Sequence, residues 1–422
     1  MDRILEDREN RINNLKKFMI NDNLYVVVKA NIPGINKKIF YAYFFIRFFK
    51  KLLKRKYNCL RIEFFDSFDG PYYFLEITDI ELITLKKELV ILEDSHPLGR
   101  FIDLDVFRQN VVSISRHDLG CDFRKCFLCD NDAYLCIREK THSIEEILGH
   151  IQDVLIHYLL EDISNLAFDA ITLELLLEPK FGLVCENSVG SHTDMDCSLM
   201  KKSRDVIVDF FGLLFLEGMA LDYDEAFKKG REIGKIAEEY MFTVTKGINT
   251  HKGLIFCLGI VCIACGEAII NNSNFNKVFE NVAFMTRNIL DEFNQEINTE
   301  GKRLFHEYGF LGIRGEVNKG MQSVIKALKV LEKYNLYSDE ALMMTLISLV
   351  RECDDSVLLK RAGSIEKYNY FKNKISEINE YDINKINDVT KEAIKENISI
   401  GGAADLLIVT LFLHMIKERY LD

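Results

Sequence analysis

Two short clusters of charged side chains in this chain of 422 residues have the composition that metal–phosphate chemistry requires. In the first, Gly-Arg-Phe-Ile-Asp-Leu-Asp-Val, Arg100 precedes Asp103 and Asp105. The second, Gly-Ser-His-Thr-Asp-Met-Asp, spans residues 190–196 and holds the polar residues His192, Asp194 and Asp196. Carboxylates bind Mg²⁺, arginine binds phosphate through paired N–H groups, and histidine carries protons. The chain therefore predicts two phosphate-handling sites.

The first cluster has the pattern of a strand over 101–107. Asp103 and Asp105 would then share one face, about 6–7 Å apart along the chain, with apolar residues on the other face. Their oxygens can converge on one Mg²⁺ or bridge two, and Arg100 can clamp a phosphate. The alternative is a half-exposed strand with two solvated acids. The Gly-Arg pair in front favours the metal site, although both interpretations stay open.

A cysteine-rich segment follows, with the pattern C-x2-C-x6-C-x5-H. Its members are Cys126, Cys129, Cys136 and His142. These are the ligand types and short spacings of a zinc site. The alternative is a set of ordinary buried cysteines.

Three further loops of the rear portion hold polar residues. One offers Arg314 as a phosphate fork beside Glu316, and the other two place polar residues where helices are expected to begin. Free N–H groups and the helix dipole favour an anion at such positions. Each loop could be an ordinary helix cap, but their number favours phosphate binding. The residues concerned are Asn249, His251, Lys252, Arg314, Glu316, Gly401, Gly402 and Asp405.

Strand and helix signals alternate in the front portion, which predicts an α+β domain over 1–162. Strands are expected at Leu24–Ala30, Leu60–Phe65, Tyr72–Ile77 and Phe101–Phe107. Thr78 and Glu81 form a possible capping box for a helix toward Leu92. Phenylalanines alternating with lysines and arginines over 44–56 predict an amphipathic helix, whose basic face is either simply solvated or a dock for an acidic partner or a polyphosphate.

Helical patterns fill the rest of the chain, which predicts an all-α domain over 163–422. A second capping box, Ser143 with Glu146, opens the first of these patterns. Only one of the four prolines lies beyond residue 97, which suits long helices. The expected rear helices are Ile163–Leu177, Asp205–Ala220, Asp224–Val244, Leu254–Asn271, Val317–Leu336 and Ala403–Arg419.

The overall composition excludes some classes of partner. A net charge of −11 argues against nucleic acid as the main partner. The first residues are charged and show no secretory signal. The longest apolar run, Leu254–Gly266, is too short to cross a bilayer. We therefore expect a cytoplasmic protein with no membrane partner, in which the 11 cysteines are reduced thiols or metal ligands.

The rear portion resembles the triphosphoribosyl-dephospho-coenzyme A synthase family. The matching stretches are Pro-Lys-x-Gly-Leu-Val (179–184), Gly-Ser-His-x-Asp-Met-Asp (190–196), Asn-Thr-His-Lys-Gly (249–253), Gly-Ile-Arg-Gly-Glu (312–316) and Gly-Gly-x-Ala-Asp-Leu-Leu (401–407). The chain departs from the family pattern at Phe181, where the family prefers proline, at Ile400 and Ala403, and in a looser match around Asp354, Asp355 and Arg361.

The front portion resembles the apo-citrate lyase phosphoribosyl-dephospho-coenzyme A transferase family. The matches are Asn-Ile-Pro-Gly (31–34) with Lys37, Gly-Arg-x-x-Asp-x-Asp-Val (99–106), and Arg-Lys-Cys-x-x-Cys (124–129) followed by Cys136, Arg138 and His142. The two families are also known fused in this order. The front resemblance implies a nucleotidyltransferase-like domain.

The resemblance implies two transfers that make and attach the prosthetic group of citrate lyase. In the rear domain, 3′-dephospho-coenzyme A would displace adenine from ATP, with Asp194 and Asp196 on Mg²⁺, His192 or His251 moving a proton, and Lys252 and Arg314 on phosphates. In the front domain, an acyl carrier protein serine would take up the product and release pyrophosphate, with Asp103 and Asp105 on Mg²⁺ and Arg100 on the triphosphate.

Three alternatives remain at this point. The carrier could belong to a malonate decarboxylase. The chain could be a single polyphosphate hydrolase with an accessory zinc-binding domain, or a zinc-dependent scaffold without catalysis.

Overall fold

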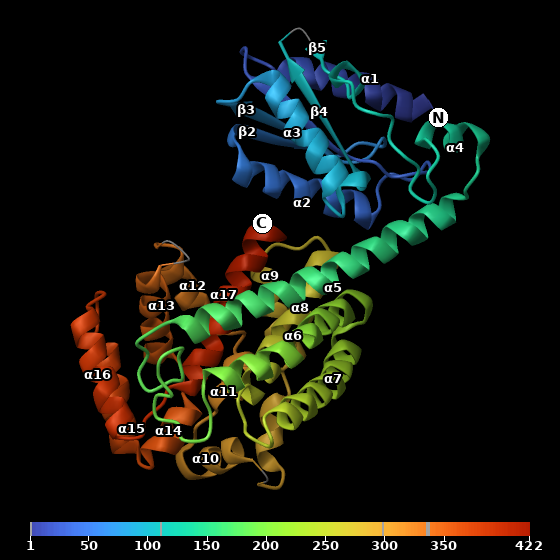
Figure 1. The fold of residues 1–422 in the computed structure, drawn as a ribbon. Coiled ribbons are helices and arrows are strands. Elements are labelled where there is room, and N and C mark those ends of the chain that lie inside the picture. Colours follow the sequence, from blue (N-terminus) through green and yellow to red (C-terminus); the bar gives the residue numbers. More distant parts are fainter. Residues whose placement is uncertain (1, 110–111, 298, 335–337) are drawn as a thin grey trace. The chain divides into compact units, whose positions relative to one another are not determined.

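The computed structural model describes residues 2–109, 112–297, 299–334 and 338–422. The chain forms two compact units, which divide between Tyr158 and Leu159. The division falls within one long helix, α5 (Ile144–Leu176) (Figure 1). The boundary expected from the sequence, after residue 162, lies in the same helix.

The front unit contains one antiparallel sheet of five strands in the order β2-β3-β1-β4-β5. All four strands predicted from the sequence are present, and the short β5 was not foreseen. The bounds are β1 (Leu24–Ala30), β2 (Asn58–Phe65), β3 (Tyr72–Thr78), β4 (Ile102–Arg108) and β5 (Val112–Ser113). The first unit contains a sheet with helices, and the described part of the second unit contains helices alone. Both agree with the predicted fold classes.

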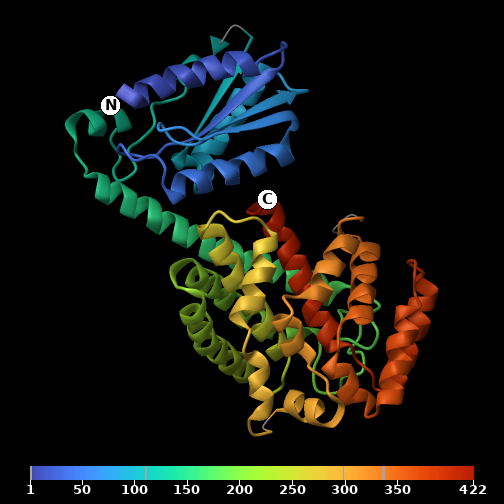
Figure 2. The same ribbon diagram turned by 180° about the vertical axis from the view of Figure 1, so that it is seen from behind.

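Helices cover both faces of this sheet. Figures 1 and 2 show α1 (Asp2–Phe18) and α2 (Phe40–Lys56) on opposite sides of the strands. Phe18 of α1 packs against Tyr25 and Phe74, while Phe45 of α2 stacks on Phe101 with ring centroids 5.2 Å apart. A third helix, α3 (Leu82–Ser95), contacts β4. Apolar residues at alternate strand positions supply both cores.

The basic helix α2 is confirmed, but its cations are not all solvated. Lys50 is 8% exposed, and its ammonium lies 5.4 Å from the centre of the Tyr73 ring. Lys54, Arg55 and Lys56 in the last turn are exposed, and Lys56 pairs with Glu88 at 2.7 Å. Positive charge at a helix C-terminus is favoured by the helix dipole.

One predicted capping box is confirmed and the other is wrong. The Ser143 N–H donates to Glu146 at 2.7 Å, and the Glu146 N–H donates to the Ser143 hydroxyl at 3.1 Å. Thr78 instead ends β3, and Asp79 adopts a φ of 64°. Helix α3 therefore begins only after Glu81 and has no side-chain cap. The rest of the front unit contains η1 (Gly99–Phe101), η2 (His117–Leu119) and α4 (Ala133–Glu139).

The described part of the rear unit is helical and contains no strand. Its elements after α5 are α6 (Cys197–Ala220), α7 (Tyr223–Val244), α8 (Lys252–Ile270), α9 (Asn276–Met285), η3 (Ile289–Asn294), α10 (Glu300–Tyr308), α11 (Gly312–Asn318), α12 (Gln322–Leu331), α13 (Asp339–Glu352), α14 (Ser356–Ala362), α15 (Ile365–Ser376), α16 (Ile383–Lys395) and α17 (Gly401–Arg419). Figure 1 labels the α-helices among them.

The single helix predicted over Val317–Leu336 is wrong. The chain forms α11 and α12 with a sharp turn between them, because Gly320 and Met321 both adopt left-handed backbone angles, with φ of 70° and 61°. The end of the predicted span, 335–337, lies outside the described residues.

Helix α8 is the core of the rear unit. At 19 residues it is long and apolar enough to cross a membrane, but 78% of its most apolar window is buried within the protein. It crosses α6 at two glycines. A Cβ added to Gly218 would lie 2.0 Å from the Ile263 carbonyl oxygen, and one added to Gly266 would lie 2.0 Å from that of Phe215. The two backbones therefore touch directly at this crossing.

Candidate active sites

The acid pair of the front unit lies on β4 as the alternation predicted. Ile102, Leu104 and Val106 are buried, whereas the side chain of Asp103 is 39% exposed and that of Asp105 is 61% exposed. Both acids line a cavity of about 450 Å³. Two accessible carboxylates, with room for water and phosphate oxygens, suit the incomplete protein coordination that Mg²⁺ usually has.

Arg124 is a cation that contacts Asp103, and motif spacing did not single it out as a site residue. Its Nη1 binds Asp103, and its Nη2 lies 2.7 Å from Glu93. Glu93 is 2% exposed and also accepts the Leu104 N–H at 2.8 Å. Burial raises the pKa of Glu93, and the Arg124 charge opposes this shift. The guanidinium is therefore fixed beside Asp103 by a buried anchor.

Lys86 and Arg116 add positive charge to the same cavity. The Lys86 ammonium donates to the Leu104 carbonyl at 2.8 Å and lies 3.8 Å from Asp105. Arg116 bonds to Glu93 at 3.1 Å. Neither residue could be assigned to the site from the sequence, because both are distant from β4 along the chain. Helix α3 brings Lys86 to the cavity, and the loop before Arg124 brings Arg116.

The structure places Arg100 and Lys37 differently from the expectation. Arg100 does not line the cavity: it donates to the Lys125 carbonyl, and its guanidinium lies 5.8 Å from the centre of the Phe127 ring. Lys37 donates to the Ile32 carbonyl, and burial lowers its pKa. Arg116 and Arg124 therefore stand where a phosphate clamp was expected from Arg100.

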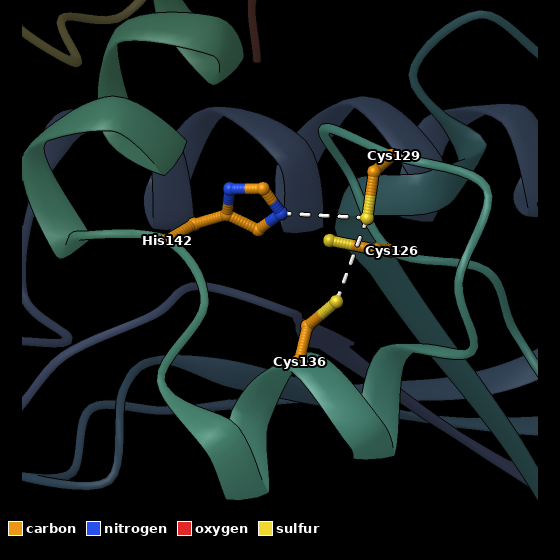
Figure 3. A group of neighbouring side chains, drawn as sticks. All are labelled: Cys126, Cys129, Cys136 and His142. Atoms are coloured by element: carbon orange, nitrogen blue, oxygen red, sulfur yellow. Dashed lines mark hydrogen bonds between the residues drawn. The ribbon is translucent and has the colours of Figure 1, made fainter.

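The four residues of the cysteine-rich pattern come together in the structure (Figure 3). Their three Sγ atoms and the imidazole lie within 4.8 Å of one another. Within the described ranges, this is the one group of three or more metal-ligating side chains so arranged.

A second cavity, of about 580 Å³, lies in the rear unit among α7, α8, η3 and α11. Two of its cations, Lys252 and Arg314, were expected from the sequence. Lys252 pairs with Glu238 at 2.7 Å, and Arg314 pairs with Glu292 at 3.0 Å. Sequence reasoning missed the three other cations, which stand on ordinary helix faces: Arg231, Lys235 and Lys302. Five cations against two glutamates favour a polyphosphate.

His192 lies outside this lining, in a cluster of loops near the start of α17. Its Nδ1 accepts a bond from Arg361 at 2.8 Å, because a guanidinium can only donate, and its Nε2 lies 3.2 Å from the Ser399 hydroxyl. Burial, assisted by the Arg361 charge, lowers the pKa of His192 to about 4. The imidazole is therefore neutral at physiological pH, with its proton on Nε2.

The acids of the second cluster are not assembled with His192 into a metal site. Asp194 is 56% exposed, and its nearest carboxylate oxygen lies 3.8 Å from His192 Nδ1. Asp196 caps α6 by accepting the Leu199 N–H at 2.8 Å. Their ligand atoms do not form a close group within the residues that the structure describes. The Mg²⁺ site expected at Asp194 and Asp196 therefore stays a prediction.

His251 is buried, at 2% exposure, and its Nδ1 lies 2.7 Å from the Ser203 hydroxyl. Burial lowers its pKa to about 3. Of the two candidate histidines, His192 is the more accessible to a substrate.

Several predicted phosphate ligands cap helices instead. Asn249 accepts the Lys252 N–H at 3.1 Å at the start of α8. Glu316 accepts the Ser323 N–H at 2.7 Å and the Ser323 hydroxyl at 2.9 Å, so it does not join Arg314 in a phosphate fork. These bonds satisfy N–H groups in the first turns of α8 and α12, whose own N-cap residues, His251 and Met321, make no side-chain cap bond.

The glycine pair of α17 is likewise occupied by the protein. The Asp355 carboxylate accepts the N–H groups of Gly402 at 3.1 Å and Ala403 at 3.0 Å. Gly401 packs against α14, since a Cβ there would lie 3.0 Å from Val357. A phosphate therefore does not have these N–H groups available.

Asp405 joins the same region to the rear cavity. A Cβ at Gly253, which lines that cavity, would lie 2.2 Å from the Asp405 carboxylate. Burial and the nearby Asp355 raise the pKa of Asp405. The starts of α8 and α17 therefore lie next to each other.

Comparison with known families gives matches over both units. The sequence model of CitX, apo-citrate lyase phosphoribosyl-dephospho-CoA transferase, matches residues 1–158. That of CitG, ATP:dephospho-CoA triphosphoribosyl transferase, matches residues 160–422. The two matches meet where the structural units divide.

Curated relatives have the same arrangement. The chain is 33% identical to Protein CitXG of Leuconostoc mesenteroides, over 97% of this chain and 96% of the relative. It is 32% identical to Protein CitXG of Haemophilus influenzae, over 80% and 78%. A 2-(5''-triphosphoribosyl)-3'-dephosphocoenzyme-A synthase of Haemophilus ducreyi matches 68% of this chain at 31% identity over 98% of its own length. The chain is therefore a member of the CitXG family of transferases for citrate lyase prosthetic-group biosynthesis, with a CitX part followed by a CitG part.

Proposed function

We propose that the chain catalyses two successive transfers, one in each unit. In the rear unit, the 2′-hydroxyl of 3′-dephospho-coenzyme A attacks C1 of the ATP ribose. A C–O bond forms, the bond from C1 to adenine breaks, and the hydroxyl proton leaves with adenine. In the front unit, a serine hydroxyl of the apo acyl carrier protein attacks the α-phosphate of that product and releases pyrophosphate. The observation that carries the proposal is the match of both families, in order, together with a fused relative that aligns with 97% of this chain.

The rear cavity suits the triphosphate of ATP. Lys252 and Arg314 are held by Glu238 and Glu292, so their ammonium and guanidinium groups are already near the cavity wall before substrate binds. Preformed cations stabilise negative charge without a reorganisation cost. Phosphates would compete with the two glutamates for these donors.

His192 is the proposed proton-transfer residue. Because Arg361 occupies Nδ1, the Nε2–H is the group that a substrate could reach in exchange for Ser399. A hydrogen bond from Nε2 to adenine would stabilise the departing base. Asp194, exposed beside His192, remains the proposed Mg²⁺ ligand of this unit, with Asp196 completing its coordination only after local rearrangement.

In the front unit, Asp103 and Asp105 are the proposed Mg²⁺ ligands. When bound there, Mg²⁺ would neutralise charge on the phosphates. Arg124 and Arg116 would contact the triphosphate, a role first assigned to Arg100, and Lys86 would balance Asp105. These side chains converge on one cavity, which supports nucleotidyltransferase-like chemistry on this sheet.

The proposed partners are ATP, 3′-dephospho-coenzyme A and the acyl carrier subunit of citrate lyase, and we place both reactions in the cytoplasm, where ATP is made available. The decisive experiment is chromatographic detection of free adenine from ATP and dephospho-coenzyme A. A polyphosphate hydrolase would give ADP and phosphate instead, and a scaffold would give neither. Carrier proteins of citrate lyase and malonate decarboxylase, supplied separately, would show which one is modified.

Two variants test whether the sites are independent. Replacing His192 and Asp194 with alanine should abolish adenine release but leave carrier loading from ready-made triphosphoribosyl-dephospho-coenzyme A. Replacing Asp103 and Asp105 with asparagine should give the opposite result. A mixture of the two variants should load the carrier from ATP and dephospho-coenzyme A. If either folded variant loses both reactions, the proposal of two separate sites is wrong.

A further inference from the structure

The cysteine–histidine cluster has the dimensions of a metal centre. Cys129 Sγ lies 3.5 Å from Cys136 Sγ and 3.4 Å from His142 Nε2. A tetrahedral zinc ion at its usual bond lengths separates two sulfur ligands by about 3.8 Å, and a sulfur from a nitrogen by about 3.5 Å. A disulfide requires a sulfur–sulfur distance of about 2.05 Å. The observed distances therefore fit coordination of one shared metal ion and do not fit a disulfide bond.

The local backbone presents the four ligands from two short pieces. Cys126 and Cys129 lie in a turn closed by two hydrogen bonds, from the Cys126 N–H to the Asn131 carbonyl at 2.7 Å and from the Ala133 N–H to the Arg124 carbonyl at 2.8 Å. Cys136 lies on α4, whose end is closed by the Thr141 N–H on the Cys136 carbonyl at 3.1 Å. His142 follows directly. All four side chains point to one centre (Figure 3).

This segment lacks a hydrophobic core of its own. Among the described residues between Phe107 and His150, Cys136 is the one buried apolar side chain. Its larger apolar neighbours are exposed: Phe123 by 63%, Tyr134 by 50% and Ile137 by 76%. A stretch that buries so little apolar surface needs another source of folding free energy, and a bound metal ion supplies it in small domains.

The cluster is tied directly to the front cavity. Arg124, which holds Asp103 and Glu93, lies two positions before Cys126. The backbone carbonyl of Lys125, which lies between them, accepts a hydrogen bond from the Arg100 guanidinium. Phe127, between the first two cysteines, packs on Phe101 with ring centroids 5.5 Å apart. A turn held in one conformation therefore also holds the backbone of Arg124 in place, and with it the start of the Arg124 side chain.

We propose that Cys126, Cys129, Cys136 and His142 bind one structural zinc ion, and that this ion positions Arg124 on Asp103. The zinc site is independent of the proposed function. The positioning role rests on the proposed function, because that role is measured by carrier loading.

Elemental analysis of the full chain, purified without chelators and without a metal-binding tag, tests the site. The expected content is about one zinc per chain. Cys129→Ser and Cys136→Ser should lose the metal, whereas Cys121→Ser, a matched change in the same segment but outside the cluster, should keep it. Substitution of Co²⁺ into the unaltered protein should give the visible bands of tetrahedral thiolate coordination, which does not depend on how the variants fold.

Absence of zinc together with absence of cobalt bands would overturn the site. So would a Cys129–Cys136 disulfide in unreduced peptides, or equal metal loss in Cys121→Ser.

The positioning role is tested by removing zinc with a thiol-blocking mercurial and a chelator, and in parallel by Cys129→Ser. Carrier loading should fall by about tenfold to a hundredfold, as a displaced arginine would cause, while adenine release is unchanged. Amide hydrogen exchange over 121–142 should accelerate. Unchanged loading after complete zinc loss would disprove the positioning role. Zinc-containing wild-type protein that never loads a carrier would instead count against the proposed function.

Discussion

The carboxylate of Asp355 lies directly against the backbone of Gly402. Its Oδ1 accepts the Gly402 N–H at 3.1 Å, and a Cβ on that glycine would lie 2.8 Å from the same oxygen. Asp355 also accepts the N–H groups of Val357 and Leu358, both at 2.9 Å. One buried carboxylate therefore caps both α14 and α17. Because this internal anion already accepts those N–H groups, the cations of the rear cavity are the better candidates for binding substrate phosphates.

This double cap should contribute measurably to stability. In Asp355→Asn, one acceptor oxygen is replaced by an NH₂ group that faces backbone N–H donors, so we expect a loss of about 2–3 kcal/mol. The exposed neighbour gives a matched control: Asp354→Asn should change the free energy of unfolding by less than about 0.5 kcal/mol. Urea denaturation measures both, and equal denaturation midpoints for the two variants would contradict the double-cap interpretation.

The low pKa of His192 predicts a specific acid sensitivity. Its pKa is about 4 in the folded protein, because of burial and Arg361, and about 6.5 in an unfolded chain. Between these values the unfolded chain binds the extra proton. Stability from this group is therefore complete above about pH 6.5 and is lost toward pH 4, by at most about 1.4 kcal/mol per pH unit.

His192→Gln should reduce the fall in urea midpoint between pH 7 and pH 5, and His157→Gln, at an exposed position on α5, should leave it unchanged. Buried His251 keeps some acid sensitivity in both variants, since its pKa of about 3 is also depressed. Identical pH slopes in His192→Gln and the unaltered protein would count against a neutral, buried His192.

The rear cavity predicts a charge-dependent affinity for ATP. Arg314→Ala and Lys252→Ala should each raise the KM for ATP about tenfold, the value of one charge-assisted hydrogen bond of about 1.4 kcal/mol. Arg303→Ala removes the same charge from a residue that pairs with Glu300 and Glu307 outside the cavity lining. Steady-state kinetics of adenine release should show no KM change in this control. A similar rise in all three would indicate a general charge effect.

The front cavity predicts that Asp105 matters only for the second transfer. Asp105→Asn should slow carrier loading and pyrophosphate release by at least about a hundredfold, as loss of a metal ligand does, while adenine release continues. Asp22→Asn is a suitable control, because Asp22 is an exposed acid that pairs with Arg108 at the far end of β4. Full loading by the Asp105→Asn protein would remove this residue from the site.

The sequence predicted local features well where near neighbours decide them. The alternation along β4 placed Asp103 and Asp105 on the accessible face, and the Ser143–Glu146 cap formed because both partners lie within one helical turn. The long helix over 317–336 failed at Gly320 and Met321, where the turn is fixed by contacts outside the helical pattern. A Cβ on Gly320, for example, would lie 2.7 Å from the Phe279 carbonyl oxygen.

The sites were predicted less completely, because their contacts join distant segments. Arg124 reaches Asp103 across a separate loop, and Asp355 reaches Gly402 from another helix. A motif shows residue types in order, but not which donor will already be occupied. Gly402 and Glu316 therefore had the residue pattern of phosphate ligands, although the protein uses both in caps.

The glycine crossing of α6 and α8 has a consequence for motion in the rear unit. At Gly218 and Gly266 the two backbones have no side chains between them that could change rotamer, so the helices cannot slide past each other without a backbone clash. Leu214, Gly259 and Ile263 of this pair form part of the cavity wall. This part of the cavity wall is therefore rigid. Any movement that admits a ligand to this cavity would therefore fall to the long charged side chains and shorter segments of the opposite wall.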